Sequence, residues 1–462
     1  MIRKNWPFIL AVSAAMLLTS CLGSDDEEYD NSYTYYNDAG IVSFSLGTLK
    51  QYRDTIAKDG SDSTYYVHIV GSSFPFVIDH AKGQIYNPDS LPWRTDVSRV
   101  KATVTTRNSS IVYMQELDKD SLIYCDFSDS IDFRKPRFIR TLSLDGTGWR
   151  KYTINVNVHQ QDGSVFAWNR MPDQSQLSEF SSLKAVPMGD SLYVFATDGT
   201  TTAVLGASRK DGVLTPLTPN INTPLAAEAH KGVVTMGGHM YFLNGQAILR
   251  TPDGTHYEQV AVNNTLTRLV AASRKELYAM TKNGGIVVSR DQGTTWESTT
   301  VDDNASLLPT DNFAYTCHAI RTNNDVDRVM LVGTVPGREY AVAWTKIADY
   351  NDKNIVYPWT FVDVADDNRY ALKAYTGLTV TQYNGGALAF GTDTEGNFSK
   401  FLTSQDGGIT WKTVSGFAVP DAFRDSKAAA FTGVADDDNY IWLVNTAGQV
   451  WRGRLNKLGW KH

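Results

Sequence analysis

The sequence predicts an all-β protein with two folded domains. Tyr, Trp, Gly and Pro, which favour strands and turns, supply 23, 11, 35 and 15 of its 462 residues. Strand cores of aromatic and aliphatic residues recur through the second part of the chain, where Ser-x-Asp-x-Gly-x-Thr-Trp also occurs twice, at 289–296 and 404–411. Because a chain of this length exceeds one ordinary core, we place a domain boundary where the repeats begin, after residue 162.

The first residues have the pattern of an export signal. A short basic start precedes an apolar run at 6–18 that is too short for a permanent membrane span. The segment Leu18-Thr19-Ser20-Cys21 resembles the lipobox of bacterial lipoproteins. This resemblance implies that residues 1–20 are a signal peptide and that Cys21 carries the lipid anchor, so we expect the protein to bind a membrane through Cys21.

Residues 21–40 are expected to form an acidic tether. The run Asp25-Asp26-Glu27-Glu28 closely follows the cysteine. Such a charge run is usually a solvated linker, but this one also resembles the surface-export signal of Bacteroidota lipoproteins. That resemblance implies an outer-membrane lipoprotein that faces the cell exterior. The alternative location is the inner leaflet, facing the periplasm.

Residues 41–162 are predicted to form a small antiparallel β-sandwich. Short alternating segments that suit half-buried strands lie at 41–44, 65–70, 102–105 and 152–158. In the last segment Tyr152, Ile154, Val156 and Val158 would share one face. The order of the segments 91–98, 130–133 and 144–146 resembles the Ig-like modules at the N-termini of Bacteroidota surface lipoproteins, which implies a structural role.

Residues 163–462 carry a repeat with the period of a four-stranded β-propeller blade. The six strand cores that define the repeat lie at 192–195, 240–243, 277–280, 329–332, 387–390 and 440–443. They predict a six-bladed β-propeller, or a seven-bladed one if a weaker copy escapes the pattern. Pairing of 164–168 with 450–460 in one blade would close the ring and leave no exposed edge strand.

The two Ser-x-Asp-x-Gly-x-Thr-Trp segments resemble the Asp-box, or BNR repeat, of sialidase-like β-propellers. The structural residues that this resemblance assigns are Ser289, Asp291, Gly293, Thr295 and Trp296, and Ser404, Asp406, Gly408, Thr410 and Trp411. The Asp accepts hydrogen bonds within its own turn, the Gly supplies backbone freedom, and the hydroxyl groups close the loop. We expect these hairpins between the third and fourth strands of blades three and five, away from any active site. Degenerate copies stand at 208–212 and 251–255.

The sequence shows no recognisable catalytic site. A sialidase resemblance would require three substrate-binding arginines, a Tyr/Glu nucleophile pair and an Asp acid–base. No arginine of the propeller region stands in a matching motif; those considered are Arg170, Arg250, Arg268, Arg321, Arg338 and Arg424. The near-match Phe133-Arg134-Lys135-Pro136 precedes the propeller. Standard hydrolase, phosphate-binding and metal motifs are missing from the sequence.

Metal and cofactor sites are not expected. The histidines do not cluster at metal-ligand spacing; those in the propeller region include His230, His239, His256 and His318. Acidic turns such as 436–439 have the ligands for Ca²⁺, but ordinary solvated loops explain them better. Cys125 and Cys317 are expected to be buried free thiols, the alternative being a disulfide between the domains. We therefore expect no catalytic residue, cofactor or bound metal.

Charge and overall resemblance favour a binding role. A net charge of −7 without a Lys/Arg cluster argues against a nucleic-acid partner. Nearly the whole chain resembles two-domain surface lipoproteins of gut Bacteroidota, which implies a non-catalytic binding or scaffold module for a glycan or another outer-membrane protein. The alternative is an exo-acting glycoside hydrolase of the sialidase-like propeller type with an atypical active site. A third reading is a structural subunit of a larger surface assembly. Enzymatic activity stays open, and we lean against it.

Overall fold

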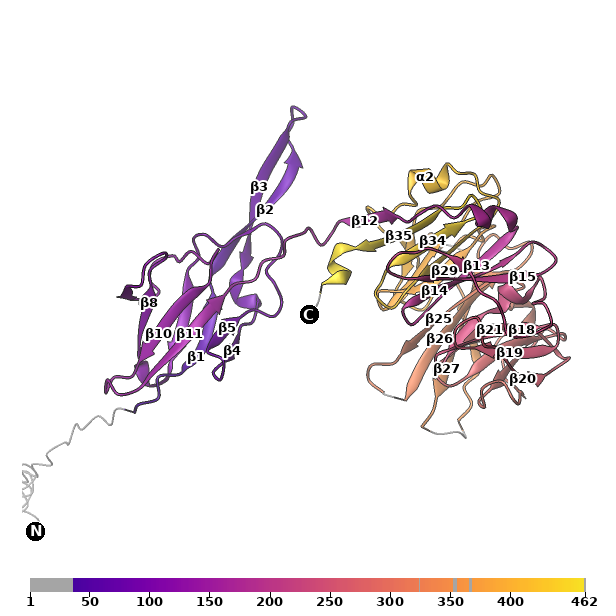
Figure 1. Cartoon of the computed structure of the whole chain (residues 1–462), viewed down its shortest axis with the longest axis horizontal. Coiled ribbons are helices and arrows are strands. Elements are labelled where there is room, and N and C mark those ends of the chain that lie inside the picture. Colours follow the sequence, from indigo (N-terminus) through magenta and orange to yellow (C-terminus); the bar gives the residue numbers. More distant parts are fainter. Residues whose placement is uncertain (1–35, 324, 352–354, 365–367, 461–462) are drawn as a thin grey trace, which may run out of the picture. The chain divides into compact units, whose positions relative to one another are not determined.

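The computed structural model describes residues 36–323, 325–351, 355–364 and 368–460. It divides the chain into two compact units, Met1–Gln160 and Gln161–His462 (Figure 1). Strands dominate both units within the described residues, and the single α-helix there is one turn long, α2 (Asp421–Arg424). No helix in these described parts is long and apolar enough to cross a bilayer. The predicted signal peptide, Cys21 and the acidic run lie outside the described residues.

The first unit is built from three sheets. Its strands are β1 (Ile41–Leu46), β2 (Thr48–Ile56), β3 (Asp62–Val70), β4 (Val77–Asp79), β5 (Gln84–Tyr86), β6 (Thr95–Asp96), β7 (Ala102–Thr106), β8 (Ile111–Gln115), β9 (Leu122–Tyr124), β10 (Arg137–Leu142) and β11 (Trp149–Asn155). They form a six-stranded sheet in the order β4-β5-β11-β10-β8-β9, a three-stranded sheet β3-β2-β6 and the pair β1-β7. The β2–β3 hairpin projects from this unit (Figure 1).

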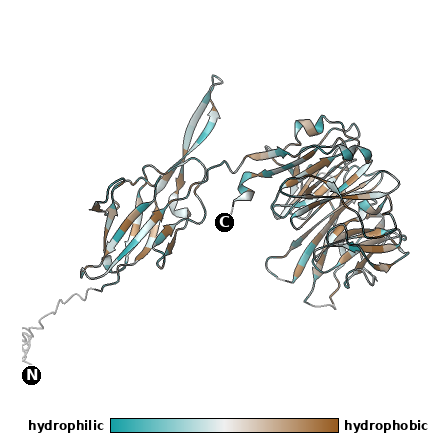
Figure 2. Ribbon diagram, in the orientation of Figure 1, coloured by the Kyte–Doolittle hydropathy of each residue, from teal (hydrophilic) through white to brown (hydrophobic). Residues whose placement is uncertain are grey.

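One hydrophobic core fills the first unit. Phe44 of β1 and Leu49 of β2 pack in the same cluster as Met114 and Ile139 of the six-stranded sheet. Burial alternates along strand β10, where Arg137, Ile139 and Thr141 are buried and the residues between them are more exposed. Figure 2 shows both hydrophobic (brown) and hydrophilic (teal) segments in the strands of this unit. The four residues predicted to share a face at 152–158 all contact this core. The strand itself, β11, ends at Asn155, so Val156 and Val158 reach the core from the segment that follows it.

The first unit departs from a purely antiparallel sandwich at one pair of strands. Strands β5 and β11 run parallel. The side chains of Asn87 and Asn157, just beyond these strands, explain how this pair is held. Asn157 N donates to Asn87 Oδ1 at 2.7 Å, and each side-chain amide donates to the other residue's carbonyl oxygen at 2.9 Å. Asn87 is fully buried, and this exchange of hydrogen bonds satisfies its polar groups.

The strands of the second unit follow one another in short, evenly spaced segments. They are β12 (Phe166–Arg170), β13 (Ser182–Met188), β14 (Ser191–Thr197), β15 (Thr202–Ser208), β16 (Thr215–Pro216), β17 (Val234–Met236), β18 (His239–Asn244), β19 (Ala247–Thr251), β20 (Glu258–Val262), β21 (Leu266–Ala272), β22 (Leu277–Thr281), β23 (Ile286–Ser289), β24 (Glu297–Ser298), β25 (Asp311–Ala319), β26 (Val326–Thr334), β27 (Val342–Asp349), β28 (Trp359–Phe361), β29 (Thr379–Tyr383), β30 (Gly386–Phe390), β31 (Leu402–Ser404), β32 (Lys412–Thr413), β33 (Phe431–Ala435), β34 (Ile441–Asn445) and β35 (Val450–Leu455).

Within the described residues these strands form six four-stranded sheets. Sheets 1 to 5 each use four consecutive strands, β13–β16, β17–β20, β21–β24, β25–β28 and β29–β32. Sheet 6 has the order β12-β35-β34-β33. The six predicted strand cores lie in the second strands, β14, β18, β22, β26, β30 and β34. These strands are apolar without alternation because both of their faces are buried, as in β30 and β34.

Sheet 6 joins the beginning of the second unit to its end. Strand β12 pairs antiparallel with β35, from Phe166 opposite Leu455 to Arg170 opposite Trp451. The predicted pairing of the two ends is therefore confirmed. The first strands of the sheets, β13, β17, β21, β25, β29 and β33, which we call the inner strands, also contact one another. Each contacts the next in chain order, and β33 contacts β13, so that these contacts form a closed cycle.

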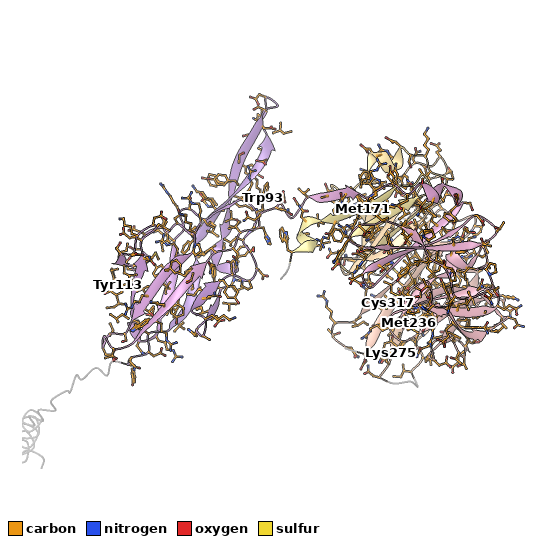
Figure 3. The ribbon with its side chains drawn as sticks, in the orientation of Figure 1. Trp93, Tyr113, Met171, Met236, Lys275 and Cys317 are labelled. Atoms are coloured by element: carbon orange, nitrogen blue, oxygen red, sulfur yellow. The ribbon has the colours of Figure 1, made fainter. Side chains whose placement is uncertain are left out.

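Both described cysteines are free thiols with partial exposure. Cys317 lies in the second unit, on inner strand β25 (Figure 3). Burial and the neighbouring Asp327 raise the pKa of its thiol to about 12. This thiol is therefore a packing residue and a poor nucleophile at neutral pH.

Candidate functional site

The second Ser-x-Asp-x-Gly-x-Thr-Trp segment forms a closed turn between β31 and β32 of sheet 5. Asp406 Oδ1 accepts hydrogen bonds from Thr410 N at 3.0 Å and Ser404 Oγ at 2.9 Å, and its Oδ2 accepts one from Thr410 Oγ1 at 2.6 Å. Ser404 Oγ in turn accepts from Gly408 N at 3.0 Å. Although burial acts in the opposite direction, these hydrogen bonds from Thr410 and Ser404 lower the pKa of Asp406.

The first copy has the same geometry between β23 and β24 of sheet 3. Asp291 Oδ1 accepts from Thr295 N and from Ser289 Oγ, each at 2.8 Å, and Gly293 N donates to Ser289 Oγ at 2.8 Å. Gly293 and Gly408 both have a φ of +97°, which only glycine adopts without strain. A side chain at Gly408 would also lie 3.0 Å from Met330 Sδ of sheet 4. The side chains of both turns are therefore engaged in holding the turns together.

The tryptophans that end the two motifs differ in burial. Each donates its indole N–H to the carbonyl oxygen of its own motif's glycine at 3.0 Å. Trp411 is 3% exposed and packs with residues of sheets 4 and 5, whereas Trp296 is only partly buried against residues of sheets 2 and 3. Trp359, fully buried at the start of β28, contacts Tyr278 of sheet 3 edge-on at 5.1 Å between ring centroids. All three pack between neighbouring sheets.

The inner strands exchange hydrogen bonds across the sheets. Ala185 N of sheet 1 donates to Thr432 Oγ1 of sheet 6 at 3.0 Å. Ala435 N of sheet 6 donates to Thr381 Oγ1 of sheet 5, also at 3.0 Å. Tyr315 of sheet 4 reaches past sheet 3, and its hydroxyl accepts from Thr235 N of sheet 2 at 3.1 Å. The middle of the second unit is thus cross-linked by polar side chains.

The two ends of each sheet differ in what they carry. Because strands alternate in direction, the segments that precede the inner strands lie at the same end as the turns between second and third strands. We call this the entry end. The turns between third and fourth strands, which include both Asp-box segments, lie at the opposite end. The short 3₁₀-helix η4 (Ala229–Gly232), just before β17, lies at the entry end and contacts β13 and β21.

Two cations from different sheets meet beside η4. Lys184 Nζ of β13 donates to Lys231 O at 3.4 Å. The next residue, Gly232, is buried, and a Cβ there would lie 2.9 Å from Arg268 Cγ of β21. Lys184 and Arg268 both keep part of their surface exposed to solvent. Burial and the charge of Arg268 lower the pKa of the Lys184 ammonium to about 8. Burial also lowers the pKa of Arg268.

Neither cation forms an ion pair with a carboxylate among the residues that the structure describes. Glu228, the residue that precedes η4, pairs with Lys231 Nζ at 2.8 Å. Arg268 instead stacks its guanidinium over the ring of Phe313 at 4.8 Å from the centroid. We name Lys184, Arg268, Phe313 and the Lys231–Gly232 peptide the entry cluster.

The side chain of His230 connects η4 to β13 beside this cluster. Its Nδ1 donates to Ala227 O at 2.7 Å, so its Nε2 accepts from Ser182 Oγ at 3.0 Å. Burial lowers the pKa of His230, which keeps the imidazole neutral at pH 7 and suits this hydrogen-bond pattern. The ring therefore fixes η4 against β13 and adds no charge to the entry cluster.

Other buried charges in the second unit are paired and join neighbouring sheets. Asp327 of sheet 4, with no exposed surface, accepts hydrogen bonds from Arg274 Nε at 2.7 Å and Tyr350 Oη at 2.8 Å. Asp436 of sheet 6 accepts from Trp442 Nε1 at 2.9 Å and pairs with Arg209 of sheet 1 at 3.3 Å. The acidic turn at 436–439 thus uses its first carboxylate in packing. The described residues contain no group of three or more metal-ligating side chains.

The arginines considered in the sequence do not come together. Arg268 alone among the six lies on an inner strand. Arg134, of the near-match before the propeller, forms an exposed ion pair with Asp132 at 2.6 Å in the first unit. Sequence reasoning missed Lys184 altogether. The signal it left is a basic residue in an inner strand whose neighbours, Leu183 and Ala185, are buried.

The fold and the family matches together classify this protein. The six sheets with their cycle of inner strands define the second unit as a β-propeller, in a protein that is all-β. The family model described as "DUF6242 beta propeller domain" matches residues 162–462, and "Domain of unknown function (DUF6242) N-terminal domain" matches residues 44–156. The chain belongs to this DUF6242 family. No curated protein matches it.

Several solved structures are similar at low sequence identity. The Hadza microbial sialidase Hz136 is 10% identical, with a TM-score of 0.36 and coverage of 90% of this chain and 93% of its own. An auxiliary nutrient binding protein from Bacteroides thetaiotaomicron VPI-5482 is 11% identical, with a TM-score of 0.36 and coverage of 90% and 97%. YCF48 from Cyanidioschyzon merolae is 16% identical, with a TM-score of 0.32 and coverage of 62% and 98%.

Proposed function

We propose that this chain is a lipid-anchored binding protein of the bacterial outer membrane that faces the cell exterior. Its lipobox-like segment ending at Cys21 and the acidic run after it support the anchor and the location. In this proposal an Ig-like sandwich carries a six-bladed propeller. The single core between the sheets of the first unit supports the sandwich, and the six sheets with their cycle of inner-strand contacts support the blade number.

We propose further that the ligand, a glycan, binds at the entry end of the propeller. The observation that carries this is the entry cluster, where Lys184 and Arg268 stay partly exposed without a carboxylate partner. Placing two like charges near each other in a partly buried position costs stability, and such local costs concentrate at functional sites. The ion pairs of Asp327 and Asp436 lie instead within packed interfaces between sheets, where a structural role accounts for them.

The test is a glycan array combined with a fluorogenic glycosidase panel. The full-length lipidated protein, purified from membranes in detergent, should bind a defined subset of glycans in a saturable manner and hydrolyse none of the panel. Binding to no glycan would contradict the proposed ligand and favour a protein partner. Hydrolysis of any sialoside or hexoside at enzyme-like rates would instead establish the exo-acting glycoside hydrolase.

A further inference from the structure

We propose that the entry cluster is an anion-binding site, in which Lys184 and Arg268 hold an acidic group of the ligand between them. This inference rests on the proposed binding function and specifies its ligand as an acidic sugar, one that carries a carboxylate or a sulfate.

The geometry brings both cations to one peptide, Lys231–Gly232. Lys184 Nζ contacts the carbonyl oxygen of Lys231, and the stem of Arg268 lies against Gly232. The two side chains come from sheets 1 and 3, on either side of sheet 2, to which η4 leads. Both are accessible to solvent in part. An anion that enters from this end would therefore meet donors from two directions.

The charge balance of the surroundings leaves room for one more negative group. At η4, Glu228 is paired with Lys231 and His230 is neutral. On β25, Asp311 attracts Arg268 without forming an ion pair with it. Burial and the charge of Arg268 now lower the pKa of Lys184, and an anion bound between Lys184 and Arg268 would raise it again.

The chemistry of the two donors favours a carboxylate. A guanidinium presents a planar fork that binds a carboxylate through two parallel hydrogen bonds, and an ammonium adds a compact charge beside it. The guanidinium carbon of Arg268 lies over the ring of Phe313, 4.8 Å from its centroid, and this cation–π contact restricts the guanidinium before an anion binds. A sulfate or phosphate would use the same charges with less directional preference.

The experiment measures binding of small probes to the full-length protein by isothermal titration calorimetry at constant ionic strength. The probes are D-glucuronate, sodium sulfate and inorganic phosphate, with D-glucose as the uncharged match to glucuronate. We expect glucuronate to bind at least about tenfold more tightly than glucose, because a charge-assisted pair contributes more than 1.4 kcal/mol. Lys184→Met and Arg268→Gln should each weaken glucuronate at least about tenfold. Lys210→Met, which removes an exposed charge from the turn between β15 and β16 at the opposite end of the propeller, should leave glucuronate binding unchanged.

The pH dependence separates direct binding from an indirect effect of the variants. Only the charged ammonium attracts the anion. The affinity of the wild type for glucuronate should therefore fall as the pH rises past about 8, the pKa of Lys184 in the ligand-free protein. Bound anion raises that pKa, and the fall should therefore be accompanied by proton uptake on binding. The Lys184→Met protein should show neither effect. Arg268→Gln should keep the pH dependence, with its midpoint moved upward because the neighbouring positive charge is gone.

The outcomes distinguish a site that recognises charge alone, a site that recognises an acidic sugar, and the absence of an anion site. Sulfate and phosphate that bind as tightly as glucuronate would support the site and assign it to charge alone. Equal binding of glucose and glucuronate, or glucuronate affinity retained in both variants, would overturn it. If glycans on the array bind both variants as well as the wild type, the binding function stands and the anion site fails. Hydrolysis on the glycosidase panel would contradict the proposed non-catalytic binding function. The calorimetric comparison of the variants would still test the anion site independently.

Discussion

At the scale of the residue, Lys184 stands out because its environment opposes its charge. Lys346, a more deeply buried lysine of β27, donates to the carbonyl oxygen of Tyr357 at close range. Lys184 has one long hydrogen bond to Lys231 O at 3.4 Å and the positive Arg268 as a neighbour. Such an arrangement lowers stability in the free protein, which is expected where a site is prepared for a ligand that is not yet bound.

Replacing Lys184 with Met should stabilise the free propeller at neutral pH. The folded-state pKa of about 8 lies below the ordinary value of 10.5. Below pH 8 both folded and unfolded chains bind the proton, and the full cost of the buried charge is present. Between pH 8 and 10.5 the unfolded chain binds more protons, so the free energy of unfolding of the wild type rises with pH. The variant should therefore gain roughly 1–3 kcal/mol at pH 7 and lose that advantage by pH 10.5.

Urea unfolding of both proteins at several pH values, followed by tryptophan fluorescence, measures this difference. Lys282→Met is the matched control because that side chain is exposed, and it should show no pH-dependent gain. A Lys184→Met protein less stable than the wild type at pH 7 would mean that the ammonium is a structural donor, and the prediction would be wrong.

At the scale of the element, the Asp-box hairpins are small self-contained structures that attach one sheet to the next. Each carboxylate is saturated by donors of its own turn, and each indole bonds to its own glycine. What differs between the copies is how far the tryptophan enters the neighbouring packing. The motif therefore sets the conformation of the turn, whereas packing of the tryptophan against the neighbouring sheet sets how much the hairpin contributes to stability.

Trp411→Ala should destabilise the propeller more than Trp296→Ala does. Trp411 is 3% exposed among residues of sheets 4 and 5, and its loss should cost about 3–5 kcal/mol. Trp296 keeps part of its surface in solvent, so its truncation should cost roughly half as much. The two variants share the motif and the indole hydrogen bond, and each is the control of the other in urea unfolding. Equal losses would show that the turn and not the packing carries the energy.

At the scale of the whole molecule, closure of the propeller depends on pairing its first strand with its last. Trp168 and Phe166 of β12 cross over Gly453 of β35. A Cβ at Gly453 would lie 2.4 Å from Trp168 Cε3 and 2.6 Å from Phe166 Cε1. The absence of a side chain at this position is thus what lets the two aromatic rings lie across the last strand.

Gly453→Ala should displace β12 and weaken closure. Accommodating the methyl group should cost about 1–3 kcal/mol, and amide hydrogen exchange should accelerate over Phe166–Arg170. Gly285→Ala is the control, because the nearest atom there, Thr281 Oγ1, would be 3.6 Å from the new Cβ. Unchanged exchange in β12 of the Gly453→Ala protein would show that the rings move aside freely.

The sequence predicted what depends on local chemistry. The six strand cores are short apolar runs, and the two Asp-box turns are encoded within eight residues each, so both were visible along the chain. The parallel pairing of β5 with β11 was not, because it depends on Asn87 and Asn157 meeting across 70 positions. The entry cluster depends on similar long-range contacts. Arg268 was one of six arginines without a motif, and only its approach to Gly232 and Lys184 distinguishes it.

The pairing of β12 with β35 also sets the order in which this propeller can be completed during translation. Sheets 1 to 5 consist of consecutive strands and can assemble as they emerge, whereas Phe166–Arg170 must wait for Val450–Leu455. Until then the first strand of the propeller offers an unsatisfied edge to any other nascent chain. The entropic cost of pairing such distant segments grows only slowly with their separation, but non-local contacts of this kind form slowly. A circular permutant that begins at β13 and ends with β12 would build all six sheets from neighbouring segments and remove that delay.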